Sequence, residues 1–147
     1  MTLAEFINKK NGVPFGHPKS LRNNLYRALG AKNFSDFWTY WNPIFGYYLG
    51  TKVYRPLKKY IPANIALILT FVFCGSIHDL VTTLIRKQIS LFFSVWFFIM
   101  VICVIITKIT RYNLSTKKWI VRAMANTTII GLSFYATHLL NHILHFY

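Results

Sequence analysis

The stretch from Asn64 to Ile85, NIALILTFVFCGSIHDLVTTLI, decides the fold class. This apolar run is long enough to cross a bilayer, because about 20 apolar residues in a helix span the hydrocarbon core. Its second half nevertheless contains His78 and Asp79. Ionisable side chains at that depth cost about 3 kcal/mol by insertion scales, so they are rare and usually face protein or a water-filled cavity. The stretch therefore predicts a transmembrane helix with a functional site at His78.

The composition supports a membrane protein and argues against a nucleic-acid-binding one. Of the 147 residues, 54% are hydrophobic and only 14% are charged, whereas soluble domains are about a quarter charged. The acidic residues are Glu5, Asp36 and Asp79, against 17 lysines and arginines. These cations cluster between apolar runs, which is the pattern of loops that face anionic lipid. We therefore expect membrane lipid as a partner and no nucleic acid.

Three apolar segments predict transmembrane helices, at residues 62–85, 89–107 and 123–144. At 1.5 Å per residue, the first two are about 36 and 28 Å long. Ten lysines and arginines precede the first segment, two lie in the turn after it, five lie in the next loop and none follows the third. This alternation predicts a multi-pass protein with a cytoplasmic N-terminus. No signal peptide is recognisable, so we expect an internal segment to direct insertion.

The remaining chain divides at residue 32. Residues 1–32 are basic and rich in turn residues, which predicts a cytoplasmic loop segment with one short helix at 20–29. Residues 33–147 form the predicted membrane domain, and its first part, 33–50, has an aromatic stripe at helical spacing that indicates an interfacial or re-entrant helix. The fold class is thus an all-α integral membrane protein with about three transmembrane helices and this additional helix.

The interfacial helix has a predicted cap and a predicted break. Asn33 can cap its N-terminus, with Asp36 at the third helical position. Pro43 disfavours helical dihedral angles at the preceding residue, so we expect Asn42 at a break in the helix. Its side chain is then either a polar group at a kink or part of a site, because broken backbone at membrane depth is tolerated where it lines a cavity.

The helical positions around His78 suggest how the site is built. Gly75 lies on the same face one turn earlier, which leaves space for a substrate or a neighbouring helix. Asp79 points about 100° away from His78, and its expected role is a structural ion pair with Arg86. A neutral imidazole suits a general base. Since Cys74 and Ser76 are expected on other faces, direct transfer fits better than a covalent enzyme intermediate.

Two further groups of residues are candidate sites. His138, His142 and His145 share one helix face, but no additional metal ligands accompany them, so interfacial histidines at a helix C-terminus are preferred to a metal centre. Cys74 and Cys103 both lie in apolar runs and are expected to be small buried hydrophobic residues. The sequence therefore predicts no metal and no bound cofactor.

Three linked motifs resemble the membrane-bound O-acyltransferase family. They are the aromatic stretch DFWTYWN ending at Asn42, the turn YRPL starting at Tyr54, and the stretch CGSIH ending at His78. Asn42 and His78 are 36 positions apart, close to the spacing in the family. The resemblance covers about residues 32–85, the C-terminal catalytic core of family members, and implies a short or truncated member. Ile77 and Asp79 replace residues that many bacterial relatives have beside the histidine.

The resemblance implies an activity and a set of site residues. His78 would be the catalytic base that deprotonates a hydroxyl acceptor, with Asn42 as the second polar catalytic residue. The donor would be the thioester of acyl-CoA or of an acyl carrier. The expected substrate-binding residues are Trp38, Trp41, Gly75 and Tyr54. The alternative is a non-catalytic membrane subunit or regulator derived from the same fold. Either protein would obtain its missing walls from a second copy or from a larger membrane partner.

Overall fold

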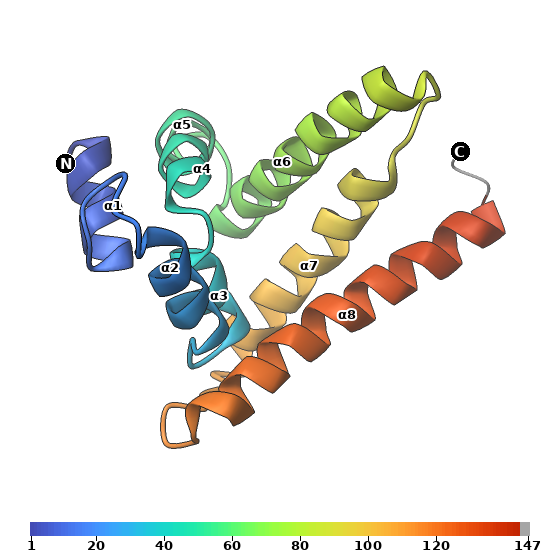
Figure 1. Ribbon diagram of the computed structural model, residues 1–147. Coiled ribbons are helices and arrows are strands. Elements are labelled where there is room, and N and C mark those ends of the chain that lie inside the picture. The colour runs from blue at the N-terminus through green and yellow to red at the C-terminus, as the bar shows by residue number, and fades with distance from the viewer. Residues whose placement is uncertain (145–147) are drawn as a thin grey trace.

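The computed structural model describes residues 1–144, and this part of the chain contains helices and no strand. Three long helices lie side by side, with α7 between α6 and α8, while shorter helices gather at the end where α6 and α8 begin (Figure 1). In chain order the elements are α1 (Leu3–Asn11), α2 (Ser20–Leu29), α3 (Phe34–Tyr40), α4 (Pro43–Tyr48), the π-helix η1 (Leu49–Tyr54), α5 (Arg55–Leu57), α6 (Ala63–Arg86), α7 (Phe92–Ile109) and α8 (Trp119–Leu144).

Two of the described helices, α6 and α7, are long and apolar enough to cross a membrane. The predicted segments 62–85 and 89–107 correspond to them, with α7 starting later because residues 87–91 form the turn. The third predicted segment, 123–144, lies within α8, which is the longest helix but is not among the two. The helix begins earlier than predicted, at Trp119, whose ring stacks on that of Tyr26 in α2 with the centroids 5.2 Å apart.

Helices α6 and α7 are joined by a polar contact that the sequence did not predict. Both carboxylate oxygens of Asp79 accept hydrogen bonds, from the backbone N–H groups of Phe93 at 2.8 Å and Ser94 at 2.7 Å. These groups lie in the first turn of α7, where no intrahelical acceptor exists. The predicted ion pair between Asp79 and Arg86 is therefore wrong, since the carboxylate caps the next helix instead. The structural role expected for Asp79 is retained in a different form.

The N-terminal segment is more ordered than the predicted loop. The short helix expected at 20–29 is α2, but residues 3–11 also form a helix, α1. Thr2 and Glu5 form a complete capping box at its start, with Thr2 N donating to Glu5 Oε2 at 2.8 Å. A capping box satisfies two otherwise unpaired donors, which stabilises a helix this short. The loop prediction for residues 3–11 is wrong because it rested on the turn residues that follow α1 and did not take this cap into account.

The predicted interfacial helix at 33–50 is divided into α3, α4 and the start of η1. Its cap is confirmed, because Asp36 N donates to the Asn33 side chain at 2.7 Å. Its break is also confirmed at Asn42, which has a left-handed backbone with φ 41° and caps α4 through Phe45 N at 3.3 Å. The single aromatic stripe is consequently split between two helices of different direction.

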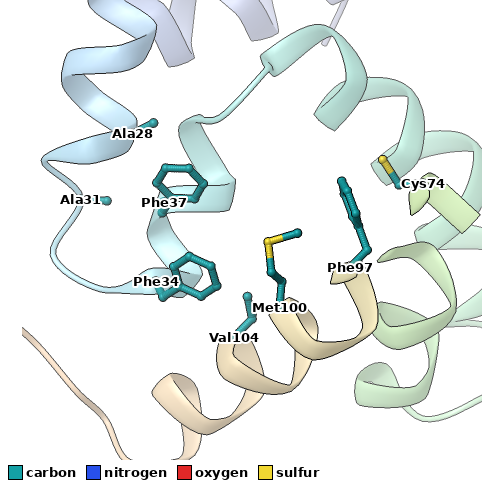
Figure 2. Close-up of a cluster of buried hydrophobic side chains, with 8 residues drawn as sticks. All are labelled: Ala28, Ala31, Phe34, Phe37, Cys74, Phe97, Met100 and Val104. Atoms are coloured by element: carbon teal, nitrogen blue, oxygen red, sulfur yellow. The ribbon is translucent and has the colours of Figure 1, made fainter. Parts of the chain in front are cut away.

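The hydrophobic core holds α3 against α7. Figure 2 shows Phe34 and Phe37 of α3 beside Met100 and Val104 of α7, with Phe97 and Cys74 continuing the cluster toward α6. Phe34 is fully buried and Phe37 is 2% exposed. At about 25 cal/mol per Å² of apolar surface, burying each such ring contributes about 2 kcal/mol. This packing holds α3, and therefore the break at Asn42 that follows it, against the helix pair α6–α7.

Candidate functional site

A cavity of about 290 Å³ lies between the segment 35–54 and the helix pair α6–α7. We call it the His78 cavity. It brings together five of the six residues that the sequence assigned to a site. The lining residues are Ser35, Trp38, Thr39, Trp41, Asn42, Phe45, Gly46, Leu49, Gly50, Tyr54, Leu67, Thr70, Phe71, Cys74, His78, Phe97, Val104 and Lys108.

The His78 cavity is elongated along the two long helices. On α6 the lining residues run from Leu67 to His78, and on α7 they run from Phe97 to Lys108. The helices are antiparallel, and the rings of His78 and Phe97 are 5.5 Å apart. Each helix therefore lines the cavity over eleven residue steps, or about 16 Å at 1.5 Å per residue. His78 lies at one end and Lys108 lies at the other.

The imidazole of His78 is framed by phenylalanine rings. Its centroid lies 5.4 Å from that of Phe93 and 6.4 Å from that of Phe45, in addition to the contact with Phe97. The side chain is still exposed, and within residues 1–144 it makes no hydrogen bond. One ring nitrogen of a neutral imidazole is a donor and the other is an acceptor. Both are therefore available to a ligand in an otherwise apolar end of the cavity.

Asn42 contributes an amide from the break between α3 and α4. Its side-chain oxygen accepts the N–H of Phe45, and this contact fixes the side chain at the start of α4. Its NH₂ group makes no hydrogen bond within the described residues. The left-handed backbone is uncommon outside glycine, although asparagine tolerates it better than most residues. A residue with a left-handed backbone that caps one helix and lines a cavity is a candidate functional position.

The aromatic site residues form the walls. Trp38 packs edge-on against Phe71 of α6 with centroids 5.0 Å apart, and Trp41 stacks on Phe37 at 5.4 Å. The indole N–H of Trp38 is buried and has no hydrogen-bond partner among the described residues. Tyr54 lines the cavity from the last position of η1. The Trp38 indole is therefore a buried, unpaired donor inside an apolar wall.

Two residues of α6 differ from their expected positions. Gly75 does not line the His78 cavity, because a Cβ atom at this position would lie 2.7 Å from the carbonyl oxygen of Phe93. Of the two roles left open for this glycine, the structure shows contact with a neighbouring helix. Cys74 was expected on another face from His78, yet both line the cavity. Residues four apart in a helix differ by only about 40°, so the expectation for Cys74 was wrong.

Sequence reasoning missed four polar lining residues, Ser35, Thr39, Thr70 and Lys108. Lys108 was counted only as part of a basic loop, and its approach to the site depends on how α7 packs against α6 and α3. Within residues 1–144, no group of three or more potential metal-ligating side chains is present. His138 and His142 are exposed on α8, and His145 lies outside the described residues.

Comparison of the chain with protein-family models, with curated proteins and with solved structures finds no match.

Proposed function

We propose that this chain is a membrane-bound O-acyltransferase-like protein that transfers an acyl group from a thioester donor to a hydroxyl acceptor, with His78 as the general base. The observation that carries the proposal is the convergence of Asn42 and His78 on one cavity, framed by Trp38, Trp41 and Tyr54. The same residues make up the motifs that resemble the family, and they come from separate elements of the chain.

The cavity supplies the groups that direct acyl transfer requires. His78 accepts the proton of the acceptor hydroxyl while its oxygen attacks the thioester carbonyl carbon. The NH₂ group of Asn42 donates a hydrogen bond to the carbonyl oxygen, which becomes negative in the tetrahedral intermediate. The carbon–sulfur bond then breaks, and the leaving thiolate takes the proton from the imidazolium. No covalent intermediate on the protein is needed.

The length of the His78 cavity favours a phosphopantetheine thioester as donor. Lys108 has no acidic partner within residues 1–144, where the ion pair present joins Lys32 to Asp36. Its charge at the far end suits a phosphate. About thirteen bonds separate the phosphorus and sulfur of phosphopantetheine, which is roughly 15 Å when extended, since an extended peptide covers about 3.5 Å in three bonds. A donor anchored at Lys108 would thus present its thioester near His78.

Substitution of His78 tests the catalytic proposal. Membranes containing the wild-type protein or His78→Ala would be supplied with a radiolabelled acyl-CoA series, and label transferred to membrane glycolipids and polysaccharides would be measured. We expect a loss of at least a hundredfold, the usual contribution of a general base. The matched control is His138→Ala, an exposed histidine on α8, which should leave transfer unchanged. Equal transfer by wild type and His78→Ala would overturn the proposal.

A non-catalytic subunit or regulator of a larger acyltransferase is the second candidate. Two features of the site favour it. His78 is exposed, and its cavity, about 290 Å³, is at the small end of the range for ligand pockets. A partner could complete the walls and supply its own base. Co-purification distinguishes the two functions. A stable complex with a larger membrane protein, whose transfer activity survives His78→Ala, would favour the regulator.

A further inference from the structure

A second hollow, of about 520 Å³, shares the lining residues Trp41 and Asn42 with the His78 cavity. We call it the N-terminal hollow. Its walls come from the end of α1, the loop before α2, the first half of α2 and the break before α4. The lining residues are Ile7, Asn11, Phe15, Gly16, His17, Pro18, Ser20, Leu21, Asn24, Leu25, Trp41, Asn42, Pro43 and Ile44.

The frame of the N-terminal hollow is a preformed polar network. The Asn11 side chain donates to Ser20 Oγ at 2.8 Å and accepts from Asn24 Nδ2 at 3.3 Å, and Asn24 also donates to the carbonyl of Tyr40. Asn11 is only 3% exposed. Buried amides that are paired in this way hold α1, α2 and the end of α3 in one arrangement. The hydrogen bonds therefore fix the positions of the helices that form the walls of the hollow.

Large apolar side chains around this polar network are exposed to solvent. Phe15 is 62% exposed, Leu21 is 70% exposed and Ile44 is 39% exposed. An exposed cluster of this kind marks a site for a membrane or a partner, since monomeric soluble proteins rarely leave such surface uncovered. The hollow is lined by residues in and around α1, α2 and α4, which belong to the group of short helices at the end where α6 begins (Figure 1). If α6 crosses the membrane, its first residues and this hollow lie at the level of lipid headgroups.

The segment that lines the hollow carries two exposed cations that are not themselves lining residues. Lys19 precedes the lining residue Ser20 and Arg22 follows the lining residue Leu21, whereas Glu5, the acidic residue of segment 1–32, is occupied by its capping box. His17 Nδ1 accepts the N–H of Lys19 at 3.1 Å. Its other ring nitrogen must then carry the proton and can donate to an anion. This segment therefore places two exposed cations and a hydrogen-bond donor next in sequence to the apolar lining residues.

From this arrangement we propose that the N-terminal hollow binds an anionic phospholipid, with the acyl chains against Phe15, Leu21 and Ile44 and the phosphate between His17, Lys19 and Arg22. A lipid fits better than an acidic peptide because the apolar side chains and the cations are adjacent, as tails and headgroup are. The inference rests on the membrane insertion proposed above, but not on acyl transfer. The lipid would lie against Trp41 and Asn42, which also form the wall of the His78 cavity.

Photoactivatable lipids test the proposal. The protein would be reconstituted into phosphatidylcholine nanodiscs that carry a trace of either phosphatidylglycerol or phosphatidylcholine with a diazirine in the acyl chain, and labelled peptides would be mapped by mass spectrometry. We expect phosphatidylglycerol to label residues 15–25 and 43–44 preferentially. Each cation near an anionic lipid contributes about fivefold in binding. Lys19→Gln with Arg22→Gln should therefore lower this labelling about 25-fold and leave labelling by phosphatidylcholine unchanged.

The matched control removes the same charge elsewhere. Lys117→Gln with Lys118→Gln, in the connection between α7 and α8, should leave labelling of the hollow within twofold. Equal labelling by the two lipids, or an equal loss in this control, would overturn the inference, because the effect would then be general apolar contact or net charge. Labelling by neither lipid in discs that hold inserted protein would assign the hollow to a protein partner and also overturn it. Failure of the protein to enter the discs would instead contradict the membrane insertion proposed above.

Discussion

At the scale of single residues, Asn42 has two separable roles, and substitutions can distinguish them. Asn42→Asp keeps the oxygen that caps α4 but removes the NH₂ donor. We expect this variant to match the wild-type thermal stability while acyl transfer falls at least tenfold. Asn42→Ala should also lose transfer, and in addition about 1–2 kcal/mol of stability through the lost cap and the strained left-handed backbone.

The Asn42 series has a control in Asn42→Gly, because glycine adopts the left-handed conformation without strain. Its stability should lie between those of the aspartate and alanine variants, while its transfer should be as low as theirs. Thermal denaturation in detergent and labelled acyl transfer measure the two properties separately. Full transfer by Asn42→Asp would show that the amide donor has no part in the reaction.

The sequence predicted which residues belong to the candidate site better than it predicted the contacts that they make. The motifs placed Asn42 and His78 together, and the structure brings both to one cavity. Local rules also located the break at Asn42, since Pro43 restricts the residue before it. The partner of Asp79 could not be predicted, because its carboxylate reaches N–H groups fourteen and fifteen positions away. A helical projection of α6 contains no information about where the next helix begins.

At the scale of elements, Asp79 fixes the start of α7. Asp79→Asn retains one acceptor but turns an NH₂ group toward a backbone N–H, which leaves that donor unpaired. A buried, unpaired donor costs about 1–3 kcal/mol. We expect the free energy of unfolding to fall by about 2 kcal/mol and the amides of Phe93 and Ser94 to exchange hydrogen faster. Exchange mass spectrometry and denaturant titration measure both effects.

The comparison variant for Asp79→Asn is Asp36→Asn, which removes an exposed ion pair with Lys32 at 3.5 Å. Exposed pairs of this kind contribute about 0.5 kcal/mol or less. This variant should be nearly neutral and should leave exchange at Phe93 unchanged. Equal effects of the two substitutions would mean that Asp79 acts through overall charge and not through capping α7.

The contact of Gly75 with α7 gives a second prediction for this helix pair. A Cβ at position 75 would meet the backbone of Phe93 and Ser94 at 2.7–2.9 Å. Overpacking of this kind typically costs about 1–3 kcal/mol, so Gly75→Ala should lower the melting temperature. Gly131→Ala on α8 is the matched control, since its Cβ meets nothing within 4 Å. That variant should be neutral or slightly more stable. A neutral Gly75→Ala would contradict close packing of α6 and α7.

At the scale of the whole molecule, the helical fold and the two apolar spans followed from composition and hydropathy, whereas three features did not. The capping box of Thr2 and Glu5 is a short signal that precedes stronger turn signals in the sequence. The π-helix η1 has no simple sequence signature and turns the chain toward α6. The position of Lys108 in the His78 cavity likewise depends on antiparallel packing of helices that are distant in sequence.

Helix α8 has polar residues on its buried face and apolar residues on its exposed face. Asn126, Ser133 and Thr137 are 1–3% exposed, whereas Leu132 is 64% exposed and Ile143 is 69% exposed. Asn126 donates to the carbonyls of Leu29 and Ala31, and Ser133 accepts from the indole of Trp96. This distribution is the reverse of that in a helix facing water. The buried polar residues lower the mean hydropathy of α8, but the surface it presents outward is suited to lipid.

We therefore predict that α8 crosses the membrane in the direction opposite to α7. With the N-terminus in the cytoplasm, as the basic residues indicate, the C-terminus then lies outside. Alkaline phosphatase fused after Tyr147 should be active and a fluorescent protein fused there dark, whereas fusions after Lys117, in the basic connection between α7 and α8, should behave in the opposite way. The same reporter behaviour at both positions would show that α8 does not cross, and α6 and α7 would then form the complete set of spans among the described helices.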